Sequence, residues 1–114
     1  MDLTEHYRGL AEDMIKLHKP LDREIDLAVA YGLFPVNDGR GMSTGIMVVM
    51  TTRSALLHQH LPVNRVIYGP RPDEAAFREM CKSMITDLRT AYDDLVNKAI
   101  TMPGRPPTGL VTGG

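Results

Sequence analysis

The sequence is poor in the residues that build reactive or ligand-lined interiors. It contains one cysteine and no tryptophan, and aromatic residues make up 5% of its 114 positions. A single cysteine excludes a disulfide within the chain, so a reducing compartment is the expected environment. The few aromatic side chains argue against a deep aromatic-lined pocket, and the eight methionines favour an aliphatic interior or interface. We predict neither a cofactor nor a bound metal.

Long apolar runs and targeting signals are also lacking. No apolar run approaches the ~20 residues that a membrane-spanning helix needs. The N-terminus is acidic and periodic, whereas a secretion signal would be basic and then apolar. These absences predict a soluble protein with no membrane partner, located in the cytoplasm or within an assembled particle such as a virion.

The charge is nearly balanced but unevenly distributed. The formal net charge of -1 argues against general binding of nucleic acids, so nucleic acid is not an expected partner. Residues 1–31 and 73–100 are acidic, whereas residues 32–72 carry one acid and four basic residues, all arginine: Arg40, Arg53, Arg65 and Arg71. Guanidinium groups pair with carboxylates in bidentate geometry, so we predict that these arginines contact the acidic helical surface of a neighbouring copy or partner. The alternative, four separate arginines near carboxylates of the same chain, remains open on the sequence alone.

Two segments have the apolar periodicity of an amphipathic helix. Residues 2–19 carry one stripe with spacings of four and three residues: Leu3, Tyr7, Leu10, Met14 and Leu17. Residues 72–100 carry a longer stripe with the same spacing: Phe77, Cys81, Met84, Leu88, Ala91 and Leu95. A second apolar edge widens this last helix, so we expect part of it to face another subunit.

The segments between these helices predict one more helix and two strands. Residues 20–31 are predicted to be helical, with Pro20 in the first turn and Gly32 as the stop. Residues 33–45 read as a loop, residues 45–52 and 64–69 as strands, and residues 54–61 fit either a short helix or a strand. The predicted fold class is therefore α+β, with two N-terminal helices and one long C-terminal helix packed on a small antiparallel β-hairpin or sheet.

The chain is expected to be one domain followed by an extended arm. Residues 1–100 are long enough for one hydrophobic core, and residues 101–114 are rich in proline and glycine. Two consecutive prolines stiffen the arm, and a Leu-Val pair provides an apolar anchor. We predict that the arm contacts a neighbouring subunit through Arg105, Pro106, Pro107, Leu110 and Val111; the alternative is a disordered end.

Candidates for chemistry are few. His58 and His60 would lie on the same face of a strand and could share a metal ion, but a site needs further ligands, and a polar interface pair is the simpler interpretation. The glycine spacing of residues 37–45 is similar to that of phosphate-binding loops, yet a strand follows it where a helix is required, which favours a turn. Cys81 lies on an apolar stripe and is predicted to be a core residue. No catalytic residue is predicted.

These observations favour a non-enzymatic structural subunit of a larger oligomer, of the kind found in virion or phage connectors and shells. Its partners would be copies of itself or other protein subunits of the assembly. Two other classes remain open. One is a small metal- or anion-binding enzyme centred on His58 and His60, and the other is a monomeric adaptor that binds one protein partner.

Overall fold

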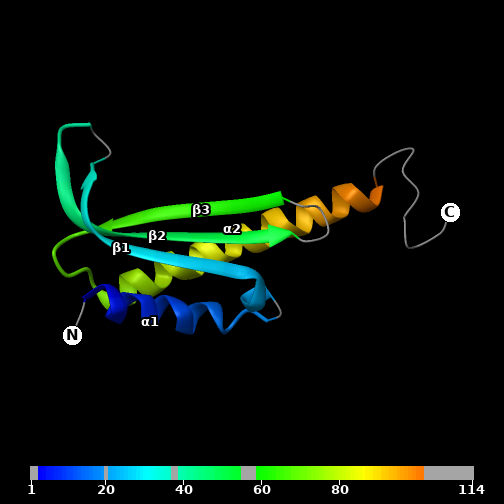
Figure 1. Ribbon diagram of the computed structural model, residues 1–114, viewed down its shortest axis with the longest axis horizontal. Helices are drawn as coiled ribbons and strands as arrows, with labels where there is room; N and C mark the ends of the chain where they lie inside the picture. Colours follow the sequence, from blue (N-terminus) through cyan, green and yellow to red (C-terminus); the bar gives the residue numbers. More distant parts are fainter. Residues whose placement is uncertain (1–2, 20, 37–38, 55–58, 102–114) are drawn as a thin grey trace.

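The protein is a two-layer α+β structure in which two helices lie against a three-stranded sheet (Figure 1). The computed structural model describes residues 3–19, 21–36, 39–54 and 59–101. Along the chain these form α1 (Leu3–Ile15), a short 3-10 helix η1 (Leu21–Glu24), β1 (Ile25–Pro35), β2 (Met42–Ser54), β3 (Gln59–Tyr68) and α2 (Glu74–Thr101). The predicted α+β class is confirmed, and the two outer helices are where the periodicity placed them.

The predicted helix over residues 20–31 is wrong. This segment forms η1 and then β1, which pairs antiparallel with β2 from Ile25 opposite Thr52 to Pro35 opposite Met42. Apolar residues at positions 25, 27, 29, 31 and 33 alternate with period two, and that pattern prevails because a neighbouring strand completes its hydrogen bonds. Gly32 is thus a strand residue and not a helix stop. The fold has two α-helices and a three-stranded sheet instead of three helices and a hairpin.

The strands expected at residues 45–52 and 64–69 are present but longer. β2 is the central strand, and the strand order is β1-β2-β3 with both pairings antiparallel. The predicted loop over residues 33–45 shrinks to the turn between β1 and β2. The amide of Val36 donates a hydrogen bond to the carbonyl oxygen of Gly41 at 3.0 Å, and the amide of Gly39 donates one to the carbonyl oxygen of Val36 at 2.9 Å. Gly39 and Gly41 have positive φ angles of 72° and 133°.

The core lies between the helices and one face of the sheet. Alternate side chains of β2 are completely buried there: Ile46, Val48, Met50 and Thr52. They meet the stripe of α2, of which four predicted members are also completely buried: Phe77, Cys81, Met84 and Leu88. Because core side chains alternate along each strand, the helices cover only one of the two faces of the sheet.

The first turn of α2 is fixed to α1. Asp73 caps the helix, since its Oδ2 accepts a hydrogen bond from the amide of Ala76 at 2.9 Å. Tyr7 of α1 donates a hydrogen bond to the carbonyl oxygen of Pro72, and its ring packs edge-on against Phe77 with centroids 4.9 Å apart. α1 ends at Ile15, so Leu17 of the predicted stripe lies beyond the helix and is 73% exposed.

The helices and the sheet cover each other over only part of their length (Figure 1). At one end the β1–β2 hairpin bends away from α1 and the first turn of α2. At the other end the last turns of α2 run beyond the ends of β2 and β3. The sheet therefore lacks a helix at one end, and the helix lacks a sheet at the other.

Candidate interaction surfaces

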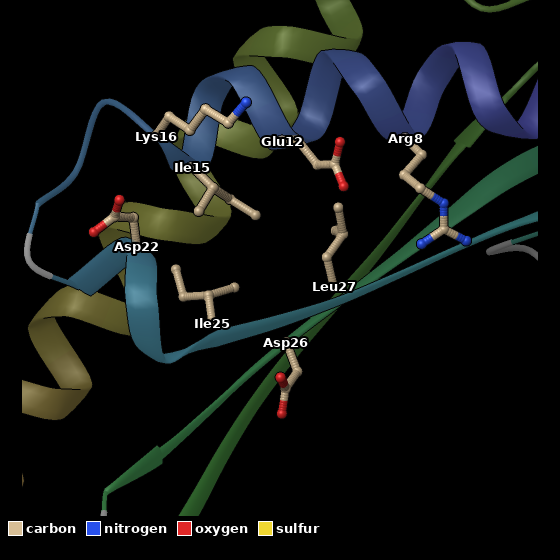
Figure 2. Close-up of a pocket in the computed structure, with 8 residues that line it drawn as sticks. All are labelled: Arg8, Glu12, Ile15, Lys16, Asp22, Ile25, Asp26 and Leu27. Carbon is tan, nitrogen blue, oxygen red and sulfur yellow. The ribbon is translucent and has the colours of Figure 1, made fainter.

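An open groove lies between α1 and the start of β1 (Figure 2). Its volume is about 460 Å³, and its walls carry charges of both signs, with Arg8 and Glu12 from α1, Lys16 directly after α1 and Asp22 from η1. Ile15, Ile25 and Leu27 line the apolar part, whereas Asp26 points to the opposite side of β1. The residues that line the groove include no histidine, cysteine, serine or threonine. The ionisable groups that the groove offers are the carboxylates of Glu12 and Asp22, the amine of Lys16 and the guanidinium of Arg8.

The two groups with shifted acidity are structural. Cys81 is completely buried, and this burial raises the pKa of its thiol to about 12. Burial also raises the pKa of Tyr7, and the nearby carboxylate of Glu74 adds to the increase. Both groups stay protonated at neutral pH, so neither provides a thiolate or phenolate for chemistry.

The predicted metal pair is only partly within the described structure. His58 lies outside the described residues, and His60 is an exposed residue of β3 opposite Arg53. Among the residues that the structure describes, no group of three His, Cys, Asp or Glu side chains is placed to hold a metal ion.

The four arginines of the middle region do not gather at one place. Arg40 lies in the β1–β2 turn and Arg71 between β3 and α2, at the end of the sheet where β3 ends. Arg53 lies near the opposite end, where β2 finishes. Within the described ranges, neither Arg53 nor Arg71 has a carboxylate at salt-bridge distance, and both are exposed.

Arg65 has a carboxylate partner in its own chain. It lies opposite Val48 on the face that the helices cover, and its Nη2 donates a hydrogen bond to Oδ2 of Asp87 in α2 at 2.8 Å. Both side chains are about half exposed, at 45% and 49%, so this ion pair contributes at most ~1 kcal/mol to stability. For Arg65 the same-chain pairing considered above is thus present. The predicted contacts of the arm, Arg105, Pro106, Pro107, Leu110 and Val111, lie outside the described residues.

The face of the sheet opposite the helices is uncovered and has an apolar centre. We call it the open face and define its centre by Ala28 and Ala30 of β1, Met47 and Val49 of β2, and Val66 of β3. The pairing places Ala30, Met47 and Val66 in one row across the three strands, and Ala28, Val49 and the exposed Asn64 in the next. Charged side chains of this face lie towards one end of the sheet, where Asp26 and Arg53 carry opposite signs.

Sequence reasoning missed the open face because it assigned β1 to a helix. The signal was present, since an alternating strand that contributes Ile25, Leu27 and Val29 to the core must place Ala28 and Ala30 on the other side. A hairpin of β2 and β3 alone would carry Met47, Val49 and Val66 on this face. β1 widens the face with two alanines and makes β2 the central strand.

Two further surfaces lie at the ends where the helices and the sheet do not cover each other. The hairpin end comprises Tyr31, Leu33 and Met42, whose side chains are 42%, 63% and 58% exposed. The helix end comprises Ala91, Tyr92, Leu95 and Val96 of α2, all of them partly exposed. Both surfaces continue the faces that form the core, the first on the sheet and the second on the helix.

Comparisons of the chain with protein families, with curated proteins and with solved structures find no match. Among the described residues, no helix combines the length and apolar character that crossing a membrane requires. The surfaces described above are therefore the basis for proposing a function.

Proposed function

We propose that this chain is a structural subunit of a homo-oligomer whose open face packs against the open face of a second copy. The observation that carries the proposal is the apolar centre of that face. Antiparallel sheets often expose one face to water, and the exposed face then carries polar side chains at alternate positions. Here five of the six positions in the two central rows are apolar, at Ala28, Ala30, Met47, Val49 and Val66, and Asn64 is the polar member.

The shape and chemistry of the open face suit a second copy. Sheets pack face to face at about 10 Å, and small side chains on an edge strand allow such an approach. Alanines occupy two positions of β1 on this face, and the larger Met47 and Val49 occupy the centre. Asp26 and Arg53 supply both signs of charge outside the apolar centre, so the surface contains partners for its own charged groups.

The described residues give the assembly role more support than an enzyme role. The groove beside α1 is lined by no histidine, cysteine, serine or threonine, and the buried Cys81 and Tyr7 stay protonated. The setting in a connector or shell is an architectural analogy, and the contribution of the arm predicted at residues 101–114 stays a prediction.

The proposal is tested by placing a charge on the open face. In Val49→Lys, a lone chain can direct the flexible ammonium group to water, but a face-to-face contact would have to bury it. We expect this variant to keep the circular dichroism spectrum of the wild type and to sediment as a smaller particle. The matched control is Ser83→Lys, which adds the same charge at an exposed position of α2 and should leave the particle unchanged.

Two results would contradict the proposal. One is a wild-type protein that sediments as a single chain at micromolar concentration. The other is a folded Val49→Lys variant whose particle has the mass of the wild type. An adaptor that binds a different protein through the same face would give the first result.

A further inference from the structure

Because the helices and the sheet cover each other only in part, one end of the molecule has sheet without helix and the other end has helix without sheet. The β1–β2 hairpin bends away from the helices, and α2 extends past the sheet (Figure 1). In the middle of the molecule the same sheet face and the same helix stripe cover each other and form the core. The two ends are thus the unpaired parts of one continuous sheet–helix packing.

The hairpin end is the uncovered continuation of the core face of the sheet. Tyr31 and Leu33 follow the buried Val29 at two-residue intervals on β1, and Met42 lies two intervals before the buried Ile46 on β2. The exposed fraction of the residue rises from 7% at Val29 to 63% at Leu33, because the helices no longer cover this part of β1. An alternating apolar strand that continues into solvent is expected to be covered by another surface.

The helix end shows the same change along α2. Its stripe is completely buried through Phe77, Cys81, Met84 and Leu88, and becomes partly exposed from Ala91 onward. The spacing does not change at this point, so the stripe keeps its apolar character while its burial decreases. The flanks of the helix end carry Arg89, Asp93, Asp94 and Lys98 as exposed residues. An apolar centre with a charged rim is the usual composition of a protein–protein contact.

We infer that the hairpin end of one copy packs on the helix end of the next copy, in a head-to-tail contact. Tyr31, Leu33 and Met42 of the first chain supply the missing sheet layer, and Leu95 with Tyr92 of the second supplies the missing helix layer. The contact repeats between two chains the packing of Ile46 and Val48 against α2 within one chain.

The contact is heterologous, which determines what it can build. It joins two different surfaces, so every added copy presents a new free end, and the series closes as a ring or continues as a filament. The inference rests on the proposed function, because it names a second interface of the same assembly. It uses none of the five residues that define the open face, so the two contacts can be tested separately.

Thiol cross-linking tests the contact directly. We would prepare Leu33→Cys and Leu95→Cys, treat each alone and their equimolar mixture with a short bismaleimide reagent, and separate the products on a denaturing gel. The native Cys81 is completely buried and should give little background. The control mixture pairs Leu33→Cys with Ser83→Cys, because Ser83 is exposed on α2 but lies outside the stripe.

The inference predicts linked dimers in the Leu33→Cys and Leu95→Cys mixture that are absent from each variant alone and from the control. The double variant Leu33→Cys/Leu95→Cys should give a ladder of linked species, since each copy carries both surfaces. An oligomer in which this mixture forms no linked dimer would overturn the head-to-tail contact and leave the open-face proposal standing. Linked dimers that persist in the Val49→Lys background would show that the two contacts are independent.

Discussion

The buried part of the α2 stripe and its exposed continuation should respond differently to the same substitution. Leu88 and Leu95 are seven residues apart on one stripe, so Leu→Ala changes the same atoms on the same helix face. Leu88 is completely buried among core residues, and its truncation should lower the free energy of unfolding by about 3 kcal/mol. Leu95 is partly exposed, and its truncation should cost a single chain roughly 1 kcal/mol, because part of its side chain already meets water.

Urea denaturation followed by circular dichroism measures both costs. The protein must be dilute enough to sediment as one chain, because association would add to the apparent stability. At higher concentration Leu95→Ala should have the larger effect, because it should weaken association more than Leu88→Ala does. Association is measured as the protein concentration at which half of the chains are assembled. Equal costs of unfolding for the two variants would refute the account in which the helices and the sheet cover each other only in part. An unchanged association of Leu95→Ala would refute the role of the helix end.

Three other predictions concern single positions. The thiol of Cys81 ionises near a pKa of 9.0 in the unfolded chain but near 12 in the folded protein, so stability should fall by up to about 4 kcal/mol as pH rises through this range. Urea midpoints should fall less steeply above pH 9 in Cys81→Ala; equal slopes would show that the thiol is not the cause. The hydroxyl of Thr52 is buried without a hydrogen-bond partner among the described residues, so Thr52→Val should raise the free energy of unfolding by about 1 kcal/mol, and a loss of stability would indicate a missed partner. Deletion of residues 102–114 should weaken association but leave the unfolding midpoint of the single chain unchanged; a lowered midpoint would place the arm in the fold.

The helices could be predicted from the sequence because their apolar residues follow one period over many turns. α2 combines a long stripe with the start signal of Pro72 and Asp73, and the structure confirms both the helix and the cap. The first helix was predicted to reach residue 19 but α1 ends at Ile15, since Leu17 fits the spacing but follows the last helical turn.

β1 could not be predicted because two periods overlap in its sequence. Leu21, Ile25 and Ala28 fit a helix face, whereas Ile25, Leu27, Val29 and Tyr31 fit a strand face, and the length of the segment suits either. The decision depends on β2, which lies some twenty residues later and offers a paired partner along the whole strand. Tertiary pairing of this kind is not visible in a local window of sequence.

The interaction surfaces were predictable in kind but not in place. The excess of apolar residues on the last helix indicated a contact beyond the chain, and the structure locates its partly exposed portion from Ala91 onward. The arginines suggested one charged surface, yet the pairing of strands distributes them to different ends of the sheet. The full open face requires β1 to be a strand, so the prediction of a helix over residues 20–31 left this surface unpredicted.

The mass of the native particle tests the central claim most directly. Sedimentation equilibrium of the wild-type protein at micromolar concentration compares that mass with the 12.7 kDa of one chain. We predict a mass of at least two chains, which falls in Val49→Lys and not in Ser83→Lys. A wild-type mass of one chain across that concentration range would contradict the claim that the open face is covered by a second copy.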